Sequence, residues 1–384
     1  MFLDPEYLRT KGDFIRAKGK AMATKDFGFK KATDARTQYD HIPTGSFFLD
    51  ILLGGGWIAG SSVEVYGQTQ TGKTFLAQHS VAQVQKGLIL PNAQIEVPTN
   101  AAWVDIENQF DRTWAEKCGV DLETLYTMED FQFMEDALGA MITALEARFA
   151  GIYVYDSVGA SLPKSQLDKK IEDALVTSTF SRAKVMKVAM ESICHSLRVK
   201  DEFGHSNPSV VLFLNHAQPD IGAGFGYTSG GGDALKLLAS TRLYFWNSNA
   251  KENRIQVGAK GSEMSVGQRC FFDVKKHRGS AAKEQRGWFD MYRMDCERDG
   301  IPHVSGSIDR VQEVVDIING GAKVPFGEAV EWEDGTALRD GHYYNLPEIG
   351  KVHGTKQLYQ ALHDNPEVRE NVERELVKVA ATIF

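Results

Sequence analysis

Residues 67–74, GQTQTGKT, have the spacing of a loop that holds the phosphate groups of a nucleotide. Strand-forming residues precede this loop at 62–66, and helix-forming residues follow it. In that order the backbone N–H groups of the loop converge on an anion at a helix N-terminus. The glycines allow close approach of the backbone, the lysine reaches the outer phosphates and the last threonine binds Mg²⁺. Unless this is an empty glycine-rich turn, the nucleotide-binding residues are Gly67, Gln68, Thr69, Gln70, Thr71, Gly72, Lys73, Thr74 and Phe75.

Two carboxylates at the ends of predicted strands supply the other groups that ATP hydrolysis needs, a metal ligand and a base for water. Asp156 ends the apolar run 151–157, where it would reach Mg²⁺ through water; capping a helix is the alternative role. Glu107 ends the run 101–107 and is placed to orient and deprotonate the attacking water, although a surface acid has the same signature. The predicted metal ligands are Thr74 and Asp156.

Asp111 and Trp114 follow Glu107 closely and form a candidate contact for the base of the nucleotide. A flat aromatic ring stacks on adenine, and a carboxylate accepts a hydrogen bond from the amino group of adenine. Packing in the core explains Trp114 equally well. Both residues are included in the predicted ATP site.

Apolar strands that alternate with helices must position these groups. The predicted strands share buried, β-branched or aromatic character and end in polar residues, and they cover 62–66, 101–107, 151–157, 209–216 and 241–246. The predicted helices between them cover 73–86, 113–118 and 129–149. This alternation indicates an α/β fold with a mostly parallel central sheet, whose ligands lie at the C-terminal ends of the strands.

The length of 384 residues exceeds one core of ordinary size. We predict a basic N-terminal arm at 1–33, an ATPase core at 34–306 and a small α/β C-terminal domain at 307–384.

No apolar run approaches the roughly 20 residues of a membrane span, and the N-terminus lacks a signal sequence, so we expect an intracellular protein without membrane contact. The four cysteines form no C-x-x-C pair, which argues against a zinc site or a disulfide framework.

Two segments have the composition of nucleic-acid-binding loops. The first, 159–187, carries several lysines and arginines, and the second, 216–236, has six glycines among residues 221–233. Backbone N–H groups of such glycines contact phosphates, and apolar side chains wedge between bases. Plain flexible loops are the alternative, and the net charge of -8 requires any nucleic-acid contact to be regional. The predicted DNA-binding residues are Lys164, Arg182, Ile221, Phe225, Gly231, Gly232 and Asp233.

Together these motifs resemble the RecA/RadA homologous recombinases, including phage members of the UvsX type. The motifs similar to the archaeal and eukaryotic branch are GFKKAT at 28–33, IPTGS at 42–46 and the phosphate loop itself. Those similar to the bacterial branch are WVDIEN at 103–108, YDSV at 155–158, GGDALK at 231–236 and DNPE at 364–367. The resemblance covers nearly the whole chain from residue 28.

The resemblance implies a DNA-dependent ATPase that uses ATP and Mg²⁺, forms helical filaments on single-stranded DNA and exchanges it with homologous duplex in recombinational repair. ATP would lie at the subunit interface, where Phe29 and Ala32 dock on the adjacent subunit. Lys276 and Arg278 of a neighbour would reach the γ-phosphate. A one-residue shift in register would place Lys275 there instead. Loader and single-strand-binding proteins are possible partners, in the cytoplasm of a bacterial or phage-infected cell. The implied catalytic residues are Lys73, Glu107, His216, Lys276 and Arg278.

His216 is a departure from the bacterial pattern, which has glutamine at the root of the second loop, and it matches UvsX-like proteins. A side chain there would touch the γ-phosphate and reorder the loop, so that one hydrogen bond couples ATP binding to DNA binding.

Two other functions remain open. One is a hexameric RecA-fold DNA helicase, against which the Phe29/Ala32 motif argues, and the other is a KaiC-like nucleotide-gated module that acts on protein partners.

Overall fold

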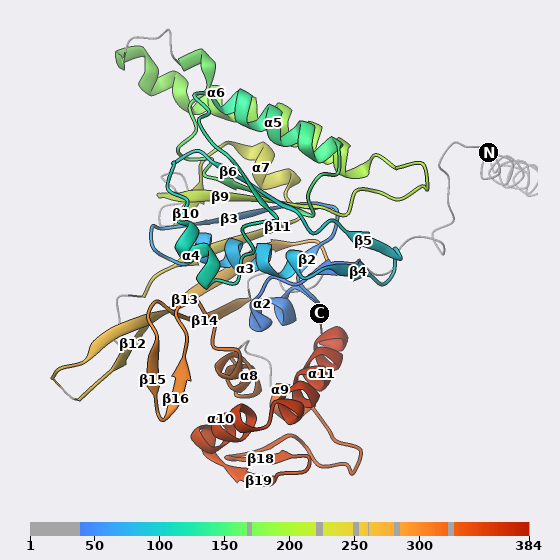
Figure 1. The fold of residues 1–384 in the computed structure, drawn as a ribbon, viewed down its shortest axis with the longest axis vertical. Coiled ribbons are helices and arrows are strands. Elements are labelled where there is room, and N and C mark those ends of the chain that lie inside the picture. The colour runs from blue at the N-terminus through green and yellow to red at the C-terminus, as the bar shows by residue number, and fades with distance from the viewer. Residues whose placement is uncertain are drawn as a thin grey trace, which may run out of the picture. The chain divides into compact units, whose positions relative to one another are not determined.

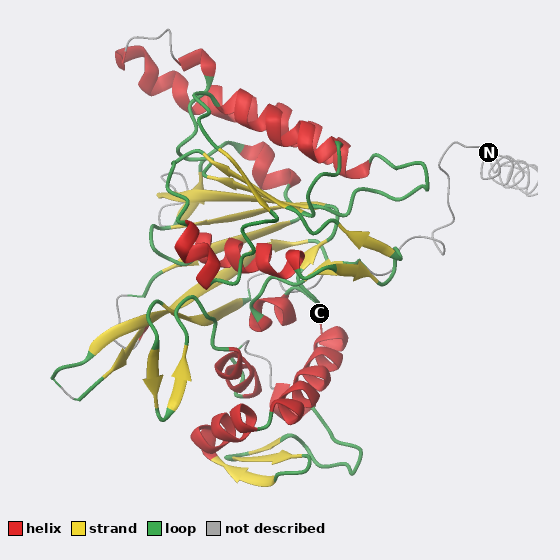
Figure 2. Cartoon of the chain, viewed as in Figure 1, coloured by secondary structure: helices red, strands yellow, loops and turns green. Residues whose placement is uncertain are grey.

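The computed structural model describes residues 39–166, 171–219, 226–248, 253–259, 261–279, 285–321 and 326–383, and only the backbone of residues 171–180 and 383. Four predicted site residues lie outside the described residues: Phe29, Ala32, Ile221 and Phe225. Residues Asp40–Phe384 form one compact unit. Figure 1 labels its helices and strands, and Figure 2 colours them by type.

A ten-stranded sheet forms the centre of this unit (Figure 1). Six neighbouring strands run parallel, in the order β11 (Thr241–Trp246), β3 (Ser61–Gly67), β9 (Val210–Pro219), β8 (Ile152–Asp156), β6 (Ala101–Asp105) and β7 (Leu125–Met128). The inner strands of this group are buried on both faces, as their β-branched and aromatic sequences predict. The predicted α/β fold with a mostly parallel sheet is confirmed.

Antiparallel strands extend the sheet beyond β11, and the sequence analysis did not predict them. The long strand β13 (Met264–His277) pairs with β11, β12 and β14, and β10 pairs with the end of β9. The bounds of these partners are β12 (Arg254–Val257), β14 (Arg286–Tyr292) and β10 (Tyr227–Ser229). Short two-stranded pairs lie outside the sheet: β1 (His41–Ile42) with β2 (Trp57–Ile58), β4 (Leu88–Leu90) with β5 (Ile95–Val97), and β15 (Cys296–Arg298) with β16 (Ile301–His303).

Helices cover both faces of the sheet (Figure 2). One face packs against α5 (Met134–Glu146), α6 (Ile171–Arg198) and α7 (Asp233–Leu238), and the short turn η2 (Lys164–Gln166) precedes α6. The other face packs against α2 (Phe47–Leu52), α3 (Lys73–Gln85) and α4 (Arg112–Lys117). No helix in the part of the chain that the structure describes has the length and apolar character needed to cross a bilayer.

Strand register brings the predicted site residues to one edge of the sheet. Gly67 at the end of β3 is paired with His216 in β9, and Asp105 at the end of β6 is paired with Asp156 in β8. Because these strands are parallel, the segments that follow them emerge together. The phosphate loop, both acidic strand ends and the described start of the second glycine-rich segment therefore share this edge.

The C-terminal residues form helices and a small sheet that pack below α2 (Figure 1). The helices are α8 (Arg310–Ile318), α9 (Phe326–Ala329), α10 (Gly354–Asp364) and α11 (Pro366–Ile383), and the strands are β17 (Arg339–Asp340), β18 (Tyr343–Leu346) and β19 (Gly350–His353). Their hydrophobic side chains belong to the same cluster as α2 and α3. The domain boundary at 306/307 stays a prediction.

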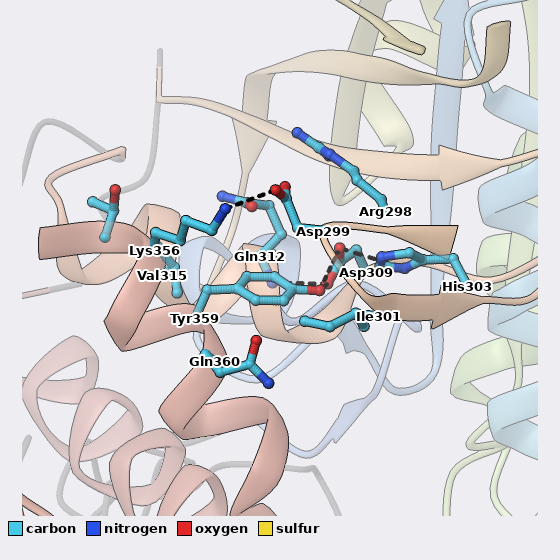
Figure 3. Close-up of a pocket in the computed structure, with 11 residues that line it drawn as sticks. Arg298, Asp299, Ile301, His303, Asp309, Gln312, Val315, Lys356, Tyr359 and Gln360 are labelled. Atoms are coloured by element: carbon cyan, nitrogen blue, oxygen red, sulfur yellow. Dashed lines mark hydrogen bonds and ion pairs between the residues drawn. The ribbon is translucent and has the colours of Figure 1, made fainter. Parts of the chain in front are cut away.

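A polar cavity of about 190 Å³ lies where α8 and α10 meet the β15–β16 pair (Figure 3). Asp309 caps α8 by accepting from the Gln312 N–H at 2.9 Å, and its two carboxylate oxygens accept from the Tyr359 hydroxyl of α10 at 3.1 and 3.0 Å. At the mouth, Lys356 of α10 pairs with Asp299 at 2.9 Å. These polar groups satisfy one another, so we assign the cavity to attachment of α10.

Buried Glu313 makes a second attachment, from α8 to the start of α2. Its carboxylate accepts from the Ser46 hydroxyl and from the N–H groups of Phe47 and Phe48 at 3.0 and 3.3 Å. These backbone groups are among those that a helix N-terminus leaves without an intrahelical partner. Burial raises the pKa of Glu313 to about 8, while the nearby guanidinium of Arg310 opposes the shift.

We predict that Glu313→Ala lowers the free energy of unfolding by about 2–4 kcal/mol, because two buried N–H groups and a hydroxyl lose their acceptor. Urea unfolding followed by circular dichroism measures the change. Glu328→Ala is the control, because Glu328 is exposed on α9. Equal unfolding midpoints for the two variants would contradict the capping role of Glu313.

Candidate functional site

The phosphate loop joins β3 to α3 through positions that exclude side chains. A Cβ on Gly67 would lie 2.2 Å from the carbonyl oxygen of Phe245, and one on Gly72 would lie 2.7 Å from the Sγ of Cys270. Gly72 has a φ of 97° and Gln70 a φ of 57°, so the loop turns sharply before the helix. No described side chain caps α3 at Gly72. The start of α3 can therefore present its N–H groups to an anion.

Lys73 lies over the loop that it terminates. Its Nζ donates to the carbonyl oxygens of Gly67 and Gln68 at 3.1 and 2.6 Å, and the side chain is almost fully buried. Burial lowers the pKa of Lys73 to about 8, although the nearby carboxylates of Asp156 and Glu107 raise it. The ammonium thus lies beside the phosphate loop, which fits the role of a counter-charge for bound phosphate groups.

Thr74 and Asp156, the two predicted metal ligands, face each other. The Thr74 hydroxyl donates to Oδ2 of Asp156 at 3.4 Å. Burial raises the pKa of Asp156 to about 7, and the negative charges of Glu107 and Asp105 raise it further. A hydroxyl and a carboxylate are oxygen ligands of the kind that Mg²⁺ takes, and a cation there would stabilise the ionised acid. The residues present therefore fit a Mg²⁺–nucleotide complex.

Glu107 connects the nucleotide side of the site with the second glycine-rich segment. Its Oε1 accepts from the hydroxyl of Ser157 and lies 3.2 Å from Nε2 of His216. Glu107 follows β6, whereas His216 lies in β9, so the contact spans two parallel strand ends. The structure thus places the predicted base against the predicted sensor.

A cavity of about 350 Å³ lies beside the loop, lined by residues 70–75, Trp114, Met291 and Arg293. Trp114 is half-buried, with its ring 6.1 Å from that of Phe75. Asp111 caps α4 by accepting from the N–H of Trp114 at 3.0 Å. The side chain of Phe75 packs into the core.

Sequence reasoning missed the far wall of this cavity, Met291 and Arg293. Arg293 donates to Oε1 of Gln268 at 2.5 Å, and Gln268 in turn donates to the carbonyl oxygen of Gln70 in the phosphate loop at 2.8 Å. These residues come from β13, β14 and the turn after β14, more than 190 positions beyond the loop. No local motif marks them, because only strand pairing brings them to the loop.

The predicted DNA-binding cations already tie the first loop to neighbouring helices. Nζ of Lys164 lies 2.5 Å from the carboxylate of Asp136, and Nε of Arg182 donates to the carbonyl oxygen of Ser161 at 3.2 Å. Asp233 begins α7, with its side chain largely exposed and 3.5 Å from Lys236. Lys164 and Arg182 therefore position the loop in this structure.

The roots of the two loops pack against each other at glycines. A Cβ on Gly231 would lie 3.0 Å from Val158, and one on Gly232 would lie 2.5 Å from Ala183 of α6. A Cβ on Gly159 would meet the ring of His216 at 2.9 Å. Gly231 and Gly232 also have positive φ values of 94° and 84°. The described roots of the two loops are therefore in close contact.

Lys276 and Arg278 lie away from the phosphate loop of their own chain, at the end of α7. Nζ of Lys276 donates to the carbonyl oxygens of Leu237 and Lys236 at 2.6 and 3.1 Å. Arg278 donates to the carbonyl oxygen of Leu237 at 3.4 Å. Lys275, the alternative, pairs with Asp273 at 2.9 Å. The structure groups Lys276 with Arg278 and separates Lys275 from them.

Comparison with known proteins agrees with this geometry. Residues 20–272 match the family model of the RecA N-terminal domain. The chain is similar to protein RecA of Roseiflexus castenholzii, at 30% identity over 87% of this chain and 80% of the relative, and to protein RecA of Bartonella henselae, at 29% identity over 97% and 94%. The chain therefore belongs to the RecA family of recombinases, as its motifs predict.

Proposed function

We propose that this protein is an ATP-dependent recombinase that forms helical filaments on single-stranded DNA and catalyses homologous pairing and strand exchange in DNA repair. The observation that carries the proposal is the contact between Glu107 and His216, which joins the nucleotide site to the root of the second loop. A simple nucleotide-binding module needs no such contact. The proposed location is the cytoplasm of a bacterial or phage-infected cell.

The proposed chemistry is phosphoryl transfer to water, in which positioning and charge stabilisation do most of the work. Lys73 and the backbone of residues 67–72 would hold the phosphates, and Thr74 and Asp156 would hold Mg²⁺, which would supply charge neutralisation at the phosphate oxygens. Glu107 orients the attacking water and accepts its proton. Trp114 stacks on the base of ATP, with Asp111 beside it.

Neighbouring subunits complete the proposed site. Lys276 and Arg278 contact the end of α7 and lie away from the phosphate loop of their own chain, so in this proposal they would exchange these carbonyl contacts for an anion of an adjacent copy. Cations that enter from a neighbour stabilise the charge of the transition state, as arginine fingers do. Phe29 and Ala32 of one copy would hold the next copy in place.

His216 provides the proposed link between nucleotide and DNA. Bound triphosphate competes with Glu107 for the imidazole, and the imidazole lies against Gly159 at the root of the first loop. A shift of His216 therefore reaches both loops. Backbone N–H groups at Gly231 and Gly232 would then contact phosphates of DNA.

Strand exchange between a circular single strand and homologous linear duplex tests the proposed function. We predict joint molecules with the wild-type protein and none with Lys73→Ala, because the phosphates lose their lysine. Lys86→Ala, an exposed change at the other end of α3, should behave as wild type. Electron microscopy with an ATP analogue should show helical filaments; closed rings or no response to DNA would contradict the proposal.

We predict that Glu107→Gln reduces the rate of ATP hydrolysis by about 10²–10⁴-fold, because the water loses its base. Binding of a fluorescent ATP analogue should remain close to that of wild type. Glu116→Gln, an exposed change on α4, is the matched control. Hydrolysis by Glu107→Gln at the wild-type rate would remove Glu107 from the mechanism.

We predict that His216→Ala hydrolyses ATP without the stimulation that single-stranded DNA gives to the wild type, because the link to the loop is lost. Initial rates with and without polythymidine measure the effect. His205→Ala serves as control, since His205 lies in an exposed loop at the other end of β9. Full stimulation of His216→Ala would rule out the sensor role.

A further inference from the structure

Glu64 is a buried carboxylate in the middle of β3, and the chemistry described so far does not use it. It lies three residues before the phosphate loop and has no exposed surface. Burying an ionised carboxylate costs much free energy unless its oxygens are paired. The hydrogen-bond partners of the Glu64 carboxylate therefore indicate its role.

Two side chains from the neighbouring strands pair with Glu64, one on each carboxylate oxygen. Arg242 in β11, which is directly opposite Glu64 in the sheet register, donates from Nε to Oε2 at 2.6 Å. Asn215 in β9 donates from Nδ2 to Oε1 at 3.1 Å. We call Glu64, Asn215 and Arg242 the loop clamp, because Asn215 and Arg242 also donate hydrogen bonds to residues of the second DNA loop.

The loop clamp holds two consecutive residues at the returning end of the second loop. Arg242 donates from Nη2 to the hydroxyl of Ser229 at 3.1 Å, and Asn215 donates to the carbonyl oxygen of Gly230 at 2.8 Å. Ser229 belongs to β10, whose pairing with β9 closes the loop. The next residue, Gly231, packs against Val158 at the start of the first loop.

The clamp also contacts the residue that senses the nucleotide. Oδ1 of Asn215 accepts from the backbone N–H of His216 at 2.9 Å. One side chain thus touches the root of the second loop, its returning end and the carboxylate of Glu64. The ring of His216 in turn contacts Glu107.

We propose that Glu64 is a positioning residue that fixes the returning end of the second DNA loop to the strand that carries His216. The inference rests on the proposed function, since it assigns Glu64 to the coupling of DNA binding with ATP hydrolysis. DNA that displaces residues 229–230 changes the hydrogen bonds of these residues to Asn215 and Arg242. Glu64 bonds both side chains and so couples the change in β9 to that in β11. Because Asn215 also bonds the backbone of His216, the orientation of the imidazole then follows the position of the loop.

A pair that only stabilised the sheet would need a single cation opposite the acid, and an apolar side chain of similar size would serve as well. The Glu64 carboxylate instead spans three strands, β9, β3 and β11. Both bonds that lead away from it end on adjacent residues of one loop. This convergence favours a role in the loop over a role in the sheet alone.

The test compares Glu64→Gln with Glu373→Gln. The first change turns one acceptor oxygen into an amide donor, so that Arg242 or Asn215 loses its partner. The second weakens another Arg–Glu pair, the partly buried Arg310 with Glu373, which lies in the C-terminal helices away from both loops. Ser229→Ala is added because it removes a loop contact of Arg242 and leaves the buried pair intact.

Amide hydrogen exchange at residues 227–230 is measured first, without nucleotide or DNA. We expect exchange to accelerate by about tenfold in Glu64→Gln, the effect of losing one ordinary hydrogen bond, and by a smaller factor in Ser229→Ala. Glu373→Gln should match the wild type there. Exchange equal to wild type in both Glu64→Gln and Ser229→Ala, or the same acceleration in Glu373→Gln, would overturn the proposal.

ATP hydrolysis is then titrated with polythymidine. Glu64→Gln should keep its DNA-independent rate and need about tenfold more DNA for half-maximal stimulation, whereas Glu373→Gln should respond as wild type. Identical DNA titrations of Glu64→Gln and wild type would overturn the inference. A wild-type protein that ignores DNA would instead defeat the proposed function, and the exchange rates would still decide whether Glu64 holds the loop.

Discussion

Parallel pairing of β3, β9, β8 and β6 is the constraint on which the rest of the structure depends. Parallel strands end at one edge, so the residues that follow them have to share it. The phosphate loop, Asp156, Glu107 and His216 meet there although 149 positions separate the first from the last. A slip of one residue would move every side chain of a strand to the opposite face of the sheet, so the packing on both faces fixes this register.

The sequence predicted those parts of the site that depend on short motifs or on the end of a buried strand. The phosphate loop is read from eight consecutive residues, and Asp156 and Glu107 are read from the apolar runs that precede them. The opposite wall of the cavity beside the phosphate loop, Met291 and Arg293, could not be predicted in this way. It is built by antiparallel strands whose pairing is set by tertiary packing, which leaves no local signal.

The sequence analysis also missed two buried carboxylates, although each is marked by a charged residue within an apolar run. Glu64 interrupts an apolar strand, and Glu313 interrupts an apolar helix, where a charged residue costs free energy unless it is paired. The composition of 159–187 predicts DNA binding, which stays a prediction, and it did not indicate that Lys164 and Arg182 would bind within the chain. Side-chain pairing depends on which helix lies nearby, and periodicity does not contain that information.

The packing of α2 against α8 has a consequence for dividing the chain into fragments. Five of the six residues of α2 are buried, and the ring of Phe48 lies 5.2 Å from that of Trp288 in β14. Residues from beyond position 307 complete this layer. A fragment that ended near residue 306 would leave the apolar side chains of α2 without the C-terminal helices that cover them, so we expect it to be less soluble than the full chain.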